Sequence, residues 1–198
     1  MQIENNKEQV PFEHYQRAFE KTELEEICGR LPDVQVENGV FTLNLLGTAY
    51  QVKHPEGLVT PQAPLPVQTF LLRYLLESKK TAPGVGFLTF REMSWGELYI
   101  KPYTGRVLTR AAFTLGTRLE AFRKAGEKLG GIPLPHGDVG FQFDFLENYQ
   151  VQIMVWAGDE EFPPNAQVLY ASNFEEGFAP EDRVVVGDIL VSVIKANM

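Results

Sequence analysis

The sequence predicts an α+β fold, a single domain in which helices pack on a mainly antiparallel sheet. Three observations support this class. Asn38-Gly39 stands between two β-favouring runs, which is the strongest short hairpin signal. Apolar residues recur at helical spacing in several separate segments. Strands and helices do not alternate strictly, as they would in a parallel α/β protein.

The first residues are expected to lie outside the domain. Residues 1–10 are polar and are expected to form a flexible N-terminus, so the domain is expected to span 11–198. From Pro11 onward, Phe12, Tyr15 and Phe19 fall on one helical face, which predicts the first helix.

A second helix and a meander should follow. Thr22 and Glu25 have the spacing of a capping box, which predicts a short helix ending near Arg30. The hairpin at Asn38-Gly39 and a further turn at Gly47 predict a three-stranded meander over roughly 34–53.

The middle of the chain is predicted to form a loop, a helix and a strand. The proline-rich stretch 55–66 is expected to be a loop, and Pro66 suits the first turn of the next helix. "GVGFLTF" (84–90) then predicts a strand. The apolar stripe of this helix is expected to face the core: Val67, Phe70, Leu71, Tyr74 and Leu75.

Thr109 is predicted to cap a further helix, which Gly130-Gly131 should end. Two strands, 139–145 and 150–157, should pair through a turn at Glu147-Asn148, and a short strand, 167–171, should follow. The inward-facing residues of that helix are expected to be Ala112, Leu115, Leu119 and Phe122.

The last segment fits two structures. Its apolar residues between Val185 and Ile194 have helical spacing, and Pro180, Glu181 and Asp182 suit a helix N-terminus. Its valines also suit a strand. Helix is the favoured interpretation.

Composition excludes several classes of function. The chain has 18 Lys and Arg against 26 Asp and Glu, a net charge of −8, which disfavours nucleic acid and anionic membranes as partners. Cys28 is the sole cysteine, so one chain cannot form an internal disulfide or hold a cysteine-ligated cluster. We expect a buried or half-buried thiol without function, because Glu25 and Glu26 oppose thiolate formation.

The sequence also predicts a soluble, cytoplasmic protein. "MQIENNKEQV" has neither the basic start nor the apolar core of a signal peptide. No apolar run reaches the about 20 residues of a spanning helix.

Familiar catalytic motifs are missing. There is no phosphate loop and no G-x-S-x-G, and "GVGFLTF" lacks the third glycine of a dinucleotide fingerprint. The histidines, His14, His54 and His136, are far apart in sequence and form no metal-binding pair.

Acidic and aromatic residues near glycines form the one group of residues that could bind a ligand or carry out a reaction. If the strands 139–145 and 150–157 pair antiparallel, Asp138 lies beside Gly158, so the acids of "AGDEEFPP" (157–164) share a rim with it. "LTFREMSWGELY" (88–99) supplies further candidates. The candidate ligand or partner rim comprises Arg91, Glu92, Trp95, Asp138, Trp156, Asp159, Glu160 and Glu161.

Three interpretations of the rim compete. Several carboxylates could hold a hard cation such as magnesium or calcium. A desolvated carboxylate beside Trp156 or Phe162 could serve as a general acid or base. In the third, Asp159 accepts backbone N–H bonds and fixes the turn, and at least one of Glu160 and Glu161 pairs with an arginine.

The same stretches carry a family resemblance over roughly 65–195. The chain resembles an uncharacterised prokaryotic family, domain of unknown function 3786, met mainly in anaerobes. Some relatives carry an iron–sulfur segment, which one cysteine cannot supply here. The matching pieces are "FLLRYLL" (70–76), "FRE" (90–92), "GELY" (96–99), "LGG" (129–131), "GD" (137–138), "VWAGDEEFPPNAQVLY" (155–170) and "ED" (181–182).

The resemblance implies company with corrinoid or iron–sulfur proteins of anaerobic one-carbon metabolism. The function we expect is a non-catalytic binding or accessory module in anaerobic redox or one-carbon metabolism, with a small-molecule ligand or a protein partner. The alternative is an enzyme that uses the acidic rim for divalent metal binding or acid/base chemistry. Neither the residues nor the resemblance identifies a cofactor or an oligomeric state.

Overall fold

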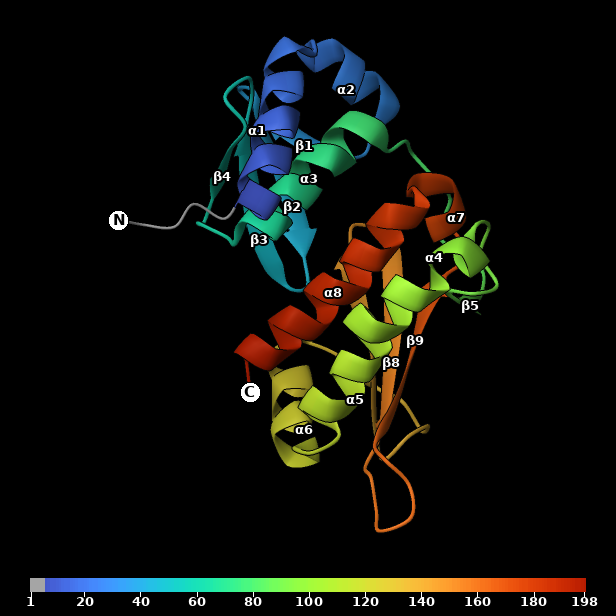
Figure 1. Cartoon of the computed structure of the whole chain (residues 1–198). Helices are drawn as coiled ribbons and strands as arrows, with labels where there is room; N and C mark the ends of the chain where they lie inside the picture. The colour runs from blue at the N-terminus through green and yellow to red at the C-terminus, as the bar shows by residue number, and fades with distance from the viewer. Residues whose placement is uncertain (1–5) are drawn as a thin grey trace. The chain divides into compact units, whose positions relative to one another are not determined.

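The structure, a computed structural model, describes residues 6–198 (Figure 1). Helices pack on strands that pair antiparallel, which confirms the predicted α+β class. The chain divides into two compact units, Met1–Thr81 and Ala82–Met198. The expected single domain over 11–198 stays a prediction. Of the expected flexible segment 1–10, residues 1–5 lie outside the described part of the chain.

The first unit is a meander covered by helices. The predicted hairpin is confirmed: Asn38 and Gly39 both have positive φ, 52° and 75°, as a type I′ turn requires. Phe19 of α1 packs edge-on against Phe41 of β2. In chain order the unit contains α1 (Asn6–Lys21), α2 (Leu24–Arg30), β1 (Gln35–Glu37), β2 (Val40–Leu45), β3 (Thr48–Lys53), β4 (Leu58–Thr60) and α3 (Leu65–Glu77).

Two local predictions for this unit are wrong. The capping box does not form, because the Thr22 hydroxyl donates to Ala18 O at 2.9 Å and so closes α1 instead of opening α2. The stretch 55–66 is not all loop, since β4 pairs with β3 inside it. The helix predicted after the loop is confirmed as α3, and its predicted apolar stripe is buried.

The second unit is a sheet in the order β6-β7-β8-β9-β5 with helices packed on it. Figure 1 shows α8 beside the run from α4 to α5, and both lie over β8 and β9. The unit contains β5 (Phe87–Thr89), α4 (Gly96–Tyr103), η1 (Thr104–Thr109, a π-helix), α5 (Arg110–Leu115), α6 (Leu119–Lys128), β6 (Ile132–Pro133), β7 (Val139–Leu146), β8 (Tyr149–Trp156), β9 (Asn165–Ala171), α7 (Phe174–Gly177) and α8 (Pro180–Ala196).

The predicted strand pair and last helix are confirmed. β7 and β8 pair antiparallel, and Glu147 has a positive φ of 49° in the turn between them. The valine-rich last segment is the helix α8, because its apolar stripe is buried along its length.

The predicted cap at Thr109 is wrong. Thr109 has helical angles, φ −62° and ψ −44°, and lies within one run of helix from α4 through η1 to α5. Pro102 and Gly105 interrupt the helical pattern in the sequence, which hid α4 and η1. The helix predicted to continue to Gly130 breaks into α5 and α6.

Candidate functional site

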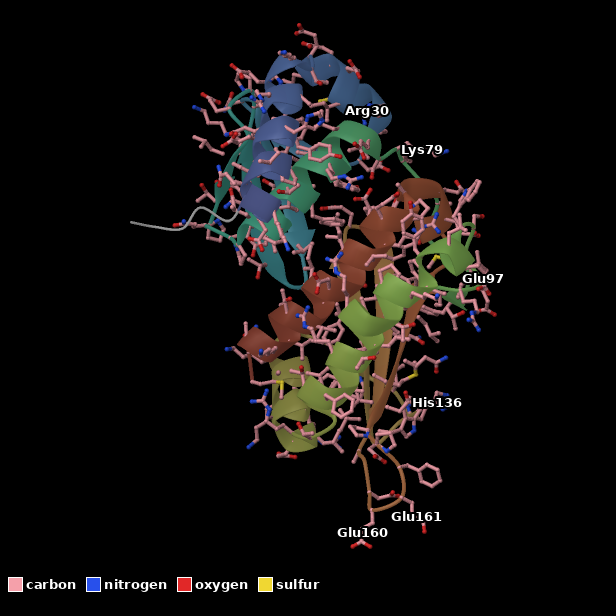
Figure 2. The ribbon with its side chains drawn as sticks, viewed as in Figure 1. Arg30, Lys79, Glu97, His136, Glu160 and Glu161 are labelled. Carbon is pink, nitrogen blue, oxygen red and sulfur yellow. The ribbon has the colours of Figure 1, made fainter. Side chains whose placement is uncertain are left out.

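The predicted rim residues lie in two separate places in the second unit. Asp138, Trp156 and the acids 159–161 surround the loop after β8. Arg91, Glu92 and Trp95 lie between β5 and α4. Figure 2 shows Glu97, which pairs with Arg91, far from Glu160 and Glu161 at the loop tip.

Asp138 lies beside the loop after β8, as antiparallel pairing requires. Its N–H donates to Val155 O at 3.0 Å, and its Oδ2 accepts from the Ala157 N–H at 2.8 Å. The carboxylate therefore ties the start of β7 to the end of β8.

Asp159 is the acid that fixes the turn. Its Oδ1 accepts from the N–H groups of Phe162 at 2.7 Å and Glu161 at 2.8 Å, and its own N–H donates to Phe162 O at 2.9 Å. The bonds from Phe162 and then Glu161 hold the pKa of the Asp159 carboxyl below its ordinary value. The geometry thus matches the structural interpretation of this residue.

Glu160 and Glu161 point outward from the tip of the loop (Figure 2). The expectation that one of them pairs with an arginine is wrong: within residues 6–198 neither has an ion pair. No group of three or more His, Cys, Asp or Glu in that range lies close enough together to hold a metal ion.

Cys28 and the three histidines are not among the predicted rim residues. Cys28 is a free, half-buried thiol on α2, which fits the expected burial. The Nε2 atom of His54 lies 2.7 Å from Thr22 O. His14 stacks edge-on against Tyr15, and His136 is exposed.

Glu92 hydrogen-bonds the last residue of the edge strand β5. β5 is the last strand of the sheet order, and Thr89 is its final residue. The Glu92 Oε2 accepts from the Thr89 N–H at 2.7 Å and from its hydroxyl at 2.8 Å, and these bonds lower the pKa of Glu92. The Thr89 N–H at the end of this edge strand is therefore satisfied.

Trp95 is the unusual residue of the second group. Its backbone is left-handed, with φ 66° and ψ 3°, directly before the first residue of α4. Such angles are an outlier for a bulky side chain and cost about 1–3 kcal/mol. Its side chain is nevertheless 67% exposed, so no burial of the indole offsets that cost.

Two charged side chains, Glu175 and Arg183, hold the residue before Trp95. The Ser94 N–H and hydroxyl both donate to Glu175 Oε1, at 2.7 and 2.9 Å. The Ser94 carbonyl accepts from Arg183 at 2.8 Å, and Arg183 also donates to Phe178 O at 3.0 Å. Arg183 is only 2% exposed, whereas Glu175 lies at the surface, so the Arg183 bonds are the buried part of this charge-assisted clamp.

The residue after Trp95 is fixed by close packing. A Cβ on Gly96 would lie 2.1 Å from Phe90 O, so no side chain fits there. The Gly96 N–H donates to Met93 O at 2.9 Å. With both neighbours fixed, the surrounding structure determines the strained backbone of Trp95.

The Tyr99 hydroxyl of α4 donates to the Glu181 carboxylate at the start of α8. Behind the pair, Phe90 stacks on Tyr103 with ring centroids 4.0 Å apart, and Tyr103 contacts the buried Tyr170. The sequence marks Pro180, Glu181 and Asp182 only as a helix start and does not indicate that Ser94, Glu175 and Arg183 meet. No local signal marks them, because they meet across more than 80 residues of sequence.

Fold and site together define an α+β protein whose distinctive surface feature is a rigidly held, exposed tryptophan. The chain belongs to the family described as Domain of unknown function (DUF3786), whose model matches residues 23–193. The match begins well before residue 65, where the resemblance seen in the sequence begins. Comparison with curated proteins and with solved structures found no match. Across residues 6–198, every helix is too short or too polar to cross a bilayer.

Proposed function

We propose that this protein is a non-catalytic binding module that docks a protein partner on the Trp95 corner, which we define as Trp95 and Leu98. The observation that supports this most is the conformation of Trp95. The chain accepts a strained backbone and still leaves the indole 67% exposed. Strain of this kind clusters at binding and catalytic sites.

The chemistry of the corner suits a protein interface. Leu98 is 71% exposed and lies in the first turn of α4, where its N–H donates to Trp95 O at 3.1 Å. Single exposed apolar residues are ordinary on protein surfaces. Two adjacent ones on a rigid element, one of them a tryptophan, have the character of an interface anchor.

The lowered pKa values of Asp159 and Glu92 argue against a catalytic role for these two acids. Asp159 and Glu92 each accept two hydrogen bonds that lower their pKa, which keeps them ionised near neutral pH. A general acid or base works best with a pKa near the working pH. These carboxylates therefore serve the turn and the sheet edge.

The metabolic setting of this module is part of the same proposal. Redox or one-carbon metabolism of anaerobes is the context we propose, and corrinoid or iron–sulfur proteins are the candidate partners. The acidic composition, with a net charge of −8, favours a partner with a basic contact surface.

Site-specific photo-crosslinking tests the proposal. Benzoylphenylalanine would replace Trp95 in one variant and Phe162 in another, and each would be expressed in the native cells. Both positions are 67% exposed and apolar, so Phe162 is a matched control. We expect a discrete adduct from position 95 and none of that mass from position 162.

The adduct partner would then be purified for a direct binding measurement. Its affinity should fall at least tenfold with Trp95→Gly and stay within twofold with Phe162→Gly. An absent adduct at position 95, or equal adducts at both positions, would contradict the proposal.

A further inference from the structure

Val85, just before the edge strand β5, is 99% exposed, more than any other large apolar residue within 6–198. A single exposed valine is ordinary on a protein surface. This one has a fixed backbone, because its N–H donates to Ser172 Oγ at 3.1 Å and the next carbonyl, Gly86 O, accepts from the Ser172 N–H at 2.8 Å. A Cβ on Gly84 would lie 2.8 Å from the Ser172 nitrogen, so the preceding residue is closely packed as well. The fold therefore presents Val85 to solvent in a defined position.

The turn that fixes Val85 also fixes the Trp95 corner. It runs from Ser172 to Glu175, and the Glu175 N–H donates to Ser172 O at 3.3 Å. Glu175 in turn accepts from the N–H and the hydroxyl of Ser94, the residue before Trp95. Figure 1 shows β5, α4 and α7 side by side, as these bonds require. Val85 and Trp95 are therefore held by the same four-residue turn.

The surface around these apolar residues is acidic. In the segments 82–98 and 172–182 the one exposed cation is Arg91, which already pairs with Glu97 at 3.1 Å. Opposite charges across an interface speed association and make binding depend on salt, although each exposed pair adds little affinity alone. This surface therefore suits a partner segment that is both apolar and basic. The exposed acids in the two segments are Glu92, Glu97, Glu175, Glu176 and Glu181.

We propose that the partner docks through a segment of apolar and basic side chains that reaches from the Trp95 corner to Val85. This inference rests on the proposed function, because it names the chemistry of the partner at the same site and adds Val85 to that site. The apolar side chains of the segment would cover Val85, Trp95 and Leu98, and its basic side chains would lie near the five glutamates. All of these residues are exposed, so contact needs no rearrangement of the fold.

Two peptides of equal apolar content test this chemistry on the purified protein. One is acetyl-KLKLK-amide, and the other is acetyl-ELELE-amide. Titrations followed by amide chemical shifts give the dissociation constant of each. We expect KLKLK to bind at least fivefold tighter than ELELE, because small contributions from several charge pairs add up. The N–H of Val85 and the indole N–H of Trp95 should shift together.

A matched pair of double variants separates local charge from net charge. Glu97→Gln with Glu176→Gln should weaken the binding of KLKLK at least threefold. Glu160→Gln with Glu161→Gln removes the same charge from the loop tip, far from Glu97 (Figure 2), and should change the affinity by less than a factor of about 1.5.

A second pair of variants tests the part played by Val85. Val85→Ser removes the apolar side chain and should weaken the binding of KLKLK at least threefold. Ile132→Ser is the control, since Ile132 is 59% exposed on β6, at the opposite edge of the sheet of this unit, and should leave the affinity unchanged.

Equal binding of the two peptides, equal effects of the two double variants, or equal effects of Val85→Ser and Ile132→Ser would overturn the inference. The crosslinking experiment at Trp95 is read separately. An adduct at position 95 without a preference for KLKLK would overturn the basic segment and leave the docking proposal standing. A preference for KLKLK without an adduct would overturn the docking proposal.

Discussion

The Arg183 guanidinium donates to the main-chain carbonyl of Ser94 at 2.8 Å and thereby joins α8 to the residue before Trp95. The two residues are far apart in sequence, and the guanidinium is buried. This contact makes the strained conformation of Trp95 a property of the tertiary structure.

Replacing Arg183 by methionine should be strongly destabilising. The change leaves the carbonyls of Ser94 and Phe178 without their charged donor, at a cost of roughly 2–4 kcal/mol in the free energy of unfolding. Urea unfolding monitored by circular dichroism gives this value. Arg118→Met, at an exposed position, should stay within about 0.5 kcal/mol of the parent protein. An equal change in the free energy of unfolding of both variants would show that the hydrogen bonds of Arg183 add no stability of their own.

A methyl group at residue 96 should also disrupt the corner. Gly96→Ala places a Cβ 2.1 Å from Phe90 O, where only backbone movement can relieve the overlap. We expect a loss of about 1–3 kcal/mol. Gly105→Ala is the control, since nothing lies within 4 Å of its added Cβ, and it should be neutral or stabilising. Denaturant unfolding gives the free energy of unfolding of both variants. An unchanged value in Gly96→Ala would contradict the close packing of Gly96 against Phe90.

The Glu175–Ser94 bonds predict a pH-dependent stability. The Ser94 N–H and then its hydroxyl lower the pKa of Glu175 in the folded state. A carboxylate with a lowered folded pKa stabilises the fold above its unfolded pKa, about 4.3, and loses this contribution as pH falls through the folded pKa. Glu175→Gln should therefore be less stable than the parent at pH 7, and the difference should shrink below about pH 4.5.

Unfolding free energies measured from pH 7 to pH 3 check this. Glu176→Gln, at the exposed neighbouring position, should follow the parent curve throughout. A difference between parent and Glu175→Gln that does not change with pH would rule out the carboxylate as its cause.

Asp159 and Glu160 should respond differently to truncation. Asp159→Ala leaves the N–H groups of Glu161 and Phe162 without their acceptor, so the melting temperature should fall. Glu160→Ala should leave it unchanged. Scanning calorimetry with and without magnesium, manganese and calcium should show no metal-dependent rise in the parent. A rise that disappears in Asp138→Ala and Glu160→Ala would restore the metal interpretation.

Local signals predicted much of the fold. Asn38-Gly39 predicted its hairpin because only a few residues tolerate two positive φ angles in succession. The spacing of apolar residues predicted α3 and α8. The capping box predicted at Thr22 is wrong because its hydroxyl can bond either at the start of α2 or at the end of α1. The local sequence does not distinguish these two bonds.

The candidate site was only partly predictable. Strand pairing alone placed Asp138 beside the loop after β8. The aromatic side chain of Trp95 marks it as a candidate in the sequence, but its left-handed backbone depends on Glu175 and Arg183, which bond to Ser94 only in the folded chain. The division of the rim into two places likewise follows from β9 and β5, whose order no local pattern specifies.

The central claim is that the protein holds Trp95 in a strained conformation for binding and not for its own stability. The unfolding free energy of Trp95→Gly tests this most directly. Glycine adopts φ 66° freely, so relief of about 1–3 kcal/mol of strain should match or exceed the about 0.4–1 kcal/mol that glycine costs through the unfolded chain. We predict that Trp95→Gly is at least as stable as the parent, whereas Phe162→Gly, equally exposed, is less stable. A loss of more than about 1 kcal/mol in Trp95→Gly would show that the indole stabilises the fold, and would contradict the account.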